Sequence, residues 1–263
     1  MNIKRIALAM GASLALLGLA GCGNDAKTDD KAQTDTIRIA TEGAYAPFNH
    51  TNSDGTLGGF DVDIANALCA KMAAECTISP QDWEGIIPAL KAGKYDAIVS
   101  SMSVTPERQE QVDFTEPYFA NTLVFIANKD KAFDPTNASE IEAAKITAQG
   151  STIASQWLSS THPSVKPQLH STLDGAFLDL NNGRVDVMVS DKLPALTWLK
   201  SDIGKNFEIK GSEIDINDKF AIAINKGNTE LTDKFNKALA DIKADGTYDE
   251  IVIKHFGKEM LPQ

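Results

Sequence analysis

The chain has 263 residues, of which 43% are hydrophobic and 23% are charged, and its formal net charge is −11. This length and composition are typical of one large soluble domain or of two lobes of ordinary size. An acidic chain without a basic stripe is repelled by a polyanion, so these values exclude nucleic acid as an expected partner.

Residues 1–21 have the composition of an export signal. The basic start MNIKR precedes an apolar run that is short for a membrane span, and LAGC follows at residues 19–22. This tetrapeptide resembles the lipobox of bacterial lipoproteins, which implies a lipid anchor on Cys22 at the outer side of a membrane; an ordinary signal peptide cleaved near Ala20 is the alternative. The polar residues 22–35 are expected to form a flexible tether.

The next segments alternate between strand and helix patterns. Residues 36–44 read as an apolar strand that ends in a turn, and the apolar positions between Phe60 and Met72 recur every four residues, as on one helix face. Thr105 followed by Pro106 predicts the start of a further helix, because threonine caps helices and proline fits their first position. Strand and helix in alternation indicate the α/β class.

The second half of the chain repeats this order. GKYDAIVSS at residues 93–101 returns as GRVDVMVSD at residues 183–191, and each stretch is preceded by a short helical pattern. The leading glycines, Gly93 and Gly183, are expected to end those helices in the left-handed conformation, with buried parallel strands at 95–99 and 185–189.

The remaining segments complete the second half. Residues 144–152 resemble residues 36–44, and residues 219–227 read as one strand. Two C-terminal helices are expected after it, one closed by Gly246 and one from residue 248 to residue 255.

The predicted export determines the expected state of Cys69 and Cys76. An exported chain with two cysteines beyond its signal most simply forms one disulfide. A reduced metal pair would need further ligands nearby, but the four histidines are scattered along the sequence. We therefore expect a disulfide, and neither a metal nor a cofactor.

Candidate ligand contacts follow the repeated strands, because open α/β sheets bind ligands beyond the carboxyl ends of their strands. In the first copy, the hydroxyls of Ser100, Ser101 and Ser103 precede Arg108, which lies in the first turn of a helix. A guanidinium offers two parallel donors that match a carboxylate, and a helix N-terminus favours an anion. A surface arginine is the alternative interpretation.

The second copy offers a complementary set. The QGST turn at residues 149–152 could close on the same carboxylate, and Asp191 is an acceptor suited to an ammonium group. A helix N-cap is an alternative role for Asp191. Glu42 could pair with a cation, and Trp83 could stack on the ligand or belong to the core.

Longer motifs carry a family resemblance. GFDVDIANALCAKM at residues 59–72 resembles the signature of family 3 bacterial solute-binding proteins, which serve polar amino-acid importers. The resemblance continues through YAPF, DWEGIIPALKAGKYDAIVSSMSVTPERQ, the QGST turn and DGTYDEI. Cys69 and Cys76 fall where the binders of basic amino acids in this family have their disulfide.

The resemblance implies a type II periplasmic-binding fold, in which two α/β lobes are joined by a two-strand hinge and close on a ligand in the cleft. It places lobe I at residues 36–120 plus 222–263 and lobe II at residues 121–221. The implied ligand contacts are Arg108, Ser103 and Thr152 for the α-carboxylate, Ser101 and Asp191 for the α-ammonium, and Glu42, Tyr45, Trp83, Ser100 and Ser151 for the side chain.

The expected function is therefore that of a monomeric substrate-binding protein which delivers an amino acid to the membrane permease of an ABC importer. Glu42 stands where binders of arginine, lysine, ornithine or histidine often have aspartate, so a basic ligand is favoured. The pair of Trp83 and Glu42 also resembles opine-binding relatives. A periplasmic cyclohexadienyl dehydratase, with Glu42 as general acid, is the enzymatic alternative, whereas we expect a non-enzyme.

Overall fold

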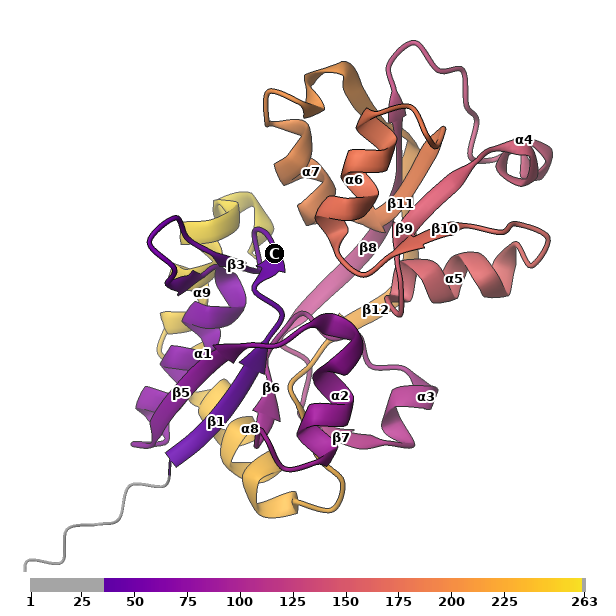
Figure 1. Ribbon diagram of the computed structural model, residues 1–263. Coiled ribbons are helices and arrows are strands. Elements are labelled where there is room, and N and C mark those ends of the chain that lie inside the picture. Colours follow the sequence, from indigo (N-terminus) through magenta and orange to yellow (C-terminus); the bar gives the residue numbers. More distant parts are fainter. Residues whose placement is uncertain (1–35, 262–263) are drawn as a thin grey trace, which may run out of the picture. The chain divides into compact units, whose positions relative to one another are not determined.

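The computed structural model describes residues 36–261, and Figure 1 shows the arrangement of the elements. The predicted export signal, the tether at 22–35 and the lipidated Cys22 lie outside the described residues. Among the residues described, no helix has the length and apolar character needed to cross a membrane.

The first of two five-stranded sheets has the strand order β5-β1-β6-β13-β7. Strand β1 pairs in parallel with β5 and β6, whereas β13 is antiparallel to β6 and β7. Helix α1 packs against α8, α9 and β5, and α2 packs against β1 and β6. The bounds are β1 Thr36–Thr41, β5 Glu75–Pro80, β6 Ala97–Ile98, β7 Val112–Phe114, β13 Ala223–Asn225, α1 Phe60–Lys71, α2 Trp83–Lys91, α3 Pro106–Gln109, α8 Thr229–Ala244 and α9 Thr247–Phe256.

The second sheet has the order β10-β9-β11-β8-β12, and a small three-stranded sheet has the order β2-β3-β4. Strand β9 is parallel to β10 and β11, and β8 runs antiparallel to β11 and β12. The bounds are β2 Ala44–Tyr45, β3 Asn49–Thr51, β4 Leu57–Gly58, β8 Phe119–Asn128, β9 Ile146–Gln149, β10 Gln168–His170, β11 Val187–Asp191, β12 Phe207–Phe220, α4 Ala138–Ala143, α5 Ile153–Thr161, α6 Leu173–Asn181 and α7 Lys192–Leu199, with short 3₁₀ turns at Gly204–Asn206 and Lys258–Met260.

The long strands β8 and β12 lie side by side where the chain passes between the two sheets (Figure 1). Phe119 pairs with Phe220 at one end of this ladder, and Asn128 pairs with Phe207 at the other. The prediction of one strand over residues 219–227 is wrong, because β12 ends at Phe220 and β13 begins at Ala223 in the other sheet. The apolar run contributes a strand to each of the two sheets, so its pattern does not reveal the boundary between β12 and β13.

The repeated unit is confirmed. Helices α2 and α6 are followed by Gly93 and Gly183, whose φ angles of 73° and 67° are left-handed. The next strands are shorter than, or offset from, the predicted ones, but β6 pairs in parallel with β1 as β11 does with β9. Thr105 caps α3 through its hydroxyl, and Pro106 begins that helix. The α/β class is therefore confirmed.

The apolar stripe of α1 lies in the largest core cluster, where Phe60, Ile64 and Leu68 have no exposed surface. The predicted disulfide between Cys69 and Cys76 is present and ties α1 to the start of β5. The disulfide lies at the amino ends of β1 and β5, whereas the loops that carry the candidate site follow the carboxyl ends of β1 and β6.

Candidate functional site

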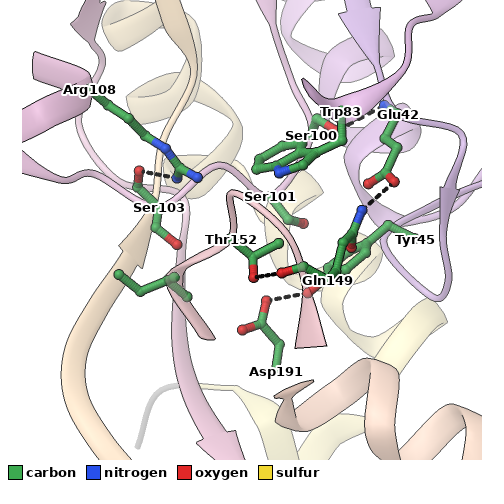
Figure 2. Close-up of a pocket in the computed structure, with 11 residues that line it drawn as sticks. Glu42, Tyr45, Trp83, Ser100, Ser101, Ser103, Arg108, Gln149, Thr152 and Asp191 are labelled. Atoms are coloured by element: carbon green, nitrogen blue, oxygen red, sulfur yellow. Dashed lines mark hydrogen bonds between the residues drawn. The ribbon is translucent and has the colours of Figure 1, made fainter. Parts of the chain in front are cut away.

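A cavity with about 260 Å³ of free space, including the part open to solvent, lies between segments that border the two large sheets (Figure 2). Nine of the ten predicted ligand contacts line it: Glu42, Tyr45, Trp83, Ser100, Ser101, Ser103, Arg108, Thr152 and Asp191. Ser151, the tenth, is not among the lining residues. Its backbone carbonyl accepts a hydrogen bond from Arg108. Gln149, which begins the predicted QGST turn, and Ile153 complete the lining and were not among the ten predicted contacts.

Arg108 is a buried cation at one side of the cavity. Its Nη1 and Nη2 atoms each donate a 2.8 Å hydrogen bond, to the carbonyl oxygens of Ser103 and Ser151. Its guanidinium carbon lies 5.2 Å from the centre of the Trp83 ring. Burial lowers the pKa of Arg108 to about 10, although nearby acid charges oppose this, so the group stays cationic at neutral pH. An anion at this place would meet an arginine held between neutral partners.

The turn before α5 faces the same cavity. Thr152 is the N-cap of α5, accepting a hydrogen bond from the Ser155 N–H, and its hydroxyl donates to the Gln149 carbonyl over 2.7 Å. Ser151 adopts a left-handed φ of 58° in this turn. A helix N-terminus beside Arg108 favours a carboxylate between them.

Asp191 lies at the end of β11 and is buried. The Tyr45 hydroxyl donates to its Oδ2 over 2.6 Å, and the Asn121 amide donates to its Oδ1 over 2.8 Å. Burial raises the pKa of Asp191 to about 7, and the charge of Asp218 adds to this, whereas the bonds from Tyr45 and Asn121 oppose it. Asp191 occupies the N-cap position of α7 but makes no side-chain capping bond. Its carboxylate is therefore directed at the site rather than at the helix.

Two serine hydroxyls of the cavity donate to buried carboxylates behind it. Ser101 Oγ donates to Asp61 over 2.9 Å, and Ser103 Oγ donates to Asp218 over 3.0 Å. A hydroxyl has one proton, so these oxygens have only lone pairs left for a ligand. The hydroxyl of Ser103 thus suits a cation, and a carboxylate contact from Ser103 would have to come from its backbone N–H.

Glu42 lies at the other end of the cavity from Arg108, and Trp83 lies between them (Figure 2). The Gln149 amide donates to Glu42 Oε1 over 2.7 Å, and the Glu42 N–H donates to Ser100 Oγ over 2.9 Å. Burial raises the pKa of Glu42 to about 7, the charges of Asp174 and Asp82 add to this, and the bond from Gln149 opposes it. A cationic group beside Glu42 would replace the water that burial removes and would favour the ionised form.

The charges of this region are unequal. Glu42, Asp191 and Asp218 are buried acids, and Arg108 is the buried base among them. A buried charge is costly unless it is paired, so this composition favours a ligand with net positive charge. Within the described residues, no cluster of histidine, cysteine or acid side chains has the grouping of a metal site.

Sequence reasoning missed the groups behind the cavity walls. Asp61, in the first turn of α1, is buried and accepts hydrogen bonds from Tyr118, Asn49 and Ser101. The sequence signal for its burial was the position of this polar residue within the apolar pattern of GFDVDI. Gln149 could have been found because it begins the predicted QGST turn.

The comparisons with known proteins identify the family and the fold. The family model for bacterial extracellular solute-binding proteins, family 3, matches residues 37–258. This range is most of the chain, so the protein belongs to that family. The chain adopts the type II periplasmic-binding fold of its structural neighbours.

Three similar proteins illustrate the range of the family. ABC transporter arginine-binding protein 1 of Escherichia coli (strain K12) is 37% identical over 219 residues, covering 82% of this chain and 88% of that protein. An ancestral arginine-binding protein bound to arginine is 36% identical, with a TM-score of 0.79 over 84% of this chain and 98% of that one. An ancestral amino acid-binding protein, a precursor of cyclohexadienyl dehydratase, is 32% identical, with a TM-score of 0.76 over 84% and 95%.

Proposed function

We propose that this protein is the extracytoplasmic substrate-binding component of an ABC importer for an L-amino acid with a cationic side chain. The observation that carries the proposal is the placement of Arg108 and Asp191 around one cavity, with Glu42 at its far end. An amino acid has one group for each of these residues, and its cationic side chain supplies the positive charge that the acids lack. Arginine-binding relatives support this choice.

The ligand would be held by both of its main-chain charges. Its carboxylate would lie between Arg108 and the N-terminus of α5 at Thr152, and its ammonium group would meet Asp191 and the lone pairs of Ser101 and Ser103. Its side chain would extend over Trp83 to Glu42. Desolvation of both charged ends is costly, so each end needs a charged or hydrogen-bonding partner.

Ligand binding would shift the population toward a closed state, and the permease would recognise that state. We propose lobes at residues 36–120 plus 222–263 and at residues 121–221, with β8 and β12 as the connections between them. Hydrogen bonds from Tyr45 to Asp191, from Gln149 to Glu42 and from Arg108 to Ser151 cross between these lobes. They would stabilise the closed state together with the ligand.

A thermal-shift screen tests this function. The twenty amino acids, ornithine, citrulline and opines are added singly to the purified protein, and arginine, lysine, ornithine or histidine should raise the unfolding midpoint most. A ligand at a hundred times its dissociation constant stabilises by about 2.7 kcal/mol. A shift with acidic or aliphatic amino acids alone would refute the role of Glu42, whereas the largest shift with an opine would identify the opine-binding alternative.

The proposed location is the outer side of a membrane, with the chain held by a lipid on Cys22. The family is extracellular, and the LAGC motif supports the anchor. Radiolabelled palmitate should be incorporated in bacteria that express the natural chain and not in those that express Cys22→Ala. Equal labelling of both would refute the anchor and leave the binding function intact.

A dehydratase is the second candidate, because a precursor of cyclohexadienyl dehydratase shares this fold and Glu42 has a pKa of about 7. A carboxyl group with that pKa could act as a general acid beside a bound carboxylate. Purified protein incubated with prephenate or arogenate would then form the aromatic product, carbon dioxide and water. We expect no product with either compound.

A further inference from the structure

We propose that Asp218 is a positioning residue of the amino-acid site, which acts on the ligand's ammonium group through Asp191 and Ser103. The inference rests on the proposed function and adds a residue that does not line the cavity. Asp218 lies in β12, opposite Asn121 of β8 in the ladder formed by the two connecting strands. It is 5% exposed.

The contacts of Asp218 reach both sides of the site. Its Oδ2 atom accepts a hydrogen bond from Ser103 Oγ over 3.0 Å and one from Asn121 Nδ2 over 2.9 Å. The same Asn121 nitrogen donates to Asp191 Oδ1 over 2.8 Å. One amide group therefore bridges two carboxylates, and one of them fixes the direction of the Ser103 hydroxyl. A shift of β8 against β12 would disturb the hydrogen bond between Asn121 and Asp218.

The bridged acids are bound by neutral donors. Tyr45 and Asn121 donate to Asp191, and Ser103 and Asn121 donate to Asp218. Two carboxylates that share a site repel each other, and a cation near both of them relieves the repulsion. The ammonium group of the ligand would be that cation, so Asp218 would contribute to its attraction without touching it.

The charged groups around the pair come from several elements. Arg108 of α3 acts on both acids through space, and Tyr45 of β2 faces Asp191 with Glu42 beyond it. Lys192, next to Asp191 in the chain, is paired with Glu213. Asp218 is the charge that most favours the protonated form of Arg108, and it raises the pKa of Asp191. Removing it should therefore change the pH range over which Asp191 is ionised.

The test is the affinity for L-arginine, measured by calorimetry between about pH 5.5 and pH 8.5. Asp218→Asn should weaken binding about tenfold at the alkaline end, where Asp191 is ionised in both proteins. It should also move the acid limb of the profile to lower pH by about one unit, because Asp191 then loses its like-charged neighbour. Asp215→Asn removes an exposed acid of the same strand and is the matched control.

Asn121→Ala should shift the acid limb in the opposite direction, and it is the second test variant if Asp218→Asn does not fold. Without the bridging amide, the repulsion between the acids grows, and the acid limb should move to higher pH. A merely structural role would lower affinity equally at every pH. The inference would be overturned if the acid limb of the affinity profile stayed at the same pH in both variants. It would also be overturned if Asp215→Asn weakened arginine binding as much as Asp218→Asn does. Absence of binding by the unchanged protein to arginine, lysine and ornithine would instead refute the proposed function.

Discussion

The proposed contact between Glu42 and the side chain of the ligand predicts that ligand affinity depends on pH. Glu42 and Asp191 both have a pKa of about 7 in the protein without ligand. A cationic ligand at the proposed site would bind their ionised forms and lower both pKa values, so binding should release protons and affinity should rise with pH. We perturb this linkage with Glu42→Gln, which keeps the shape of the side chain and removes its charge.

The magnitude follows from those two pKa values. A group with a pKa of about 7 weakens binding about tenfold at pH 6 and hardly at pH 8, because the ligand must first displace its proton. Two such groups give a change of about a hundredfold between these pH values, and Glu42→Gln leaves about tenfold. At pH 7 each group is about half protonated, so the natural protein should release about one proton per ligand and the variant about half a proton.

Calorimetry with arginine in buffers of different ionisation heat measures both quantities. Glu75→Gln changes an exposed acid in β5 and is the control, with proton release equal to that of the natural protein. Equal proton release by the natural protein and Glu42→Gln would refute the ionisation of Glu42 as a source of affinity. Affinity that rises as the pH falls would contradict the roles of both acids.

Three further predictions concern single interactions. Replacing Cys69 and Cys76 by serine should destabilise the protein by about 2–3 kcal/mol on the chain-entropy model and lower the calorimetric midpoint by about 4–10 °C; an unchanged midpoint would show that α1 and β5 hold together without the disulfide. Tyr45→Phe should weaken arginine binding about tenfold near pH 7, because Asp191 loses a donor to its ionised form; unchanged calorimetric affinity would contradict this. The contribution of Glu42 to ligand-free stability should be present below pH 4.5 and lost as the pH rises through about 7, because its pKa rises from 4.5 on folding; in urea unfolding the natural protein should lose stability relative to Glu42→Gln as the pH rises over this range, and a natural protein that gains stability relative to the variant would refute this.

Much of the architecture could be predicted from local patterns. The repeat led by Gly93 and Gly183 required two similar helix–strand units, and both glycines adopt the left-handed conformation that was expected. Glycine is favoured there because other residues are strained at positive φ. The boundary between Phe220 and Ala223 could not be read in the same way, since an apolar run has the same appearance whether it serves one sheet or two.

The site was predicted in part because its contacts follow strand ends. Arg108 and Asp191 lie where the motifs placed them, on the lining of one cavity. Asp218 and Asn121 were missed because a single polar residue in a strand pattern is usually solvent-exposed. Their role depends on the register of β8 against β12, which brings residues 97 positions apart into contact.

The orientation of a bound amino acid tests this interpretation most directly. A crystal structure of the protein grown with L-arginine should show the α-carboxylate within hydrogen-bonding distance of Arg108. The α-ammonium group should lie within the same distance of Asp191, and the guanidinium near Glu42. Arginine bound in the reverse direction, or outside the cavity that these three residues line, would contradict the proposed mode of binding.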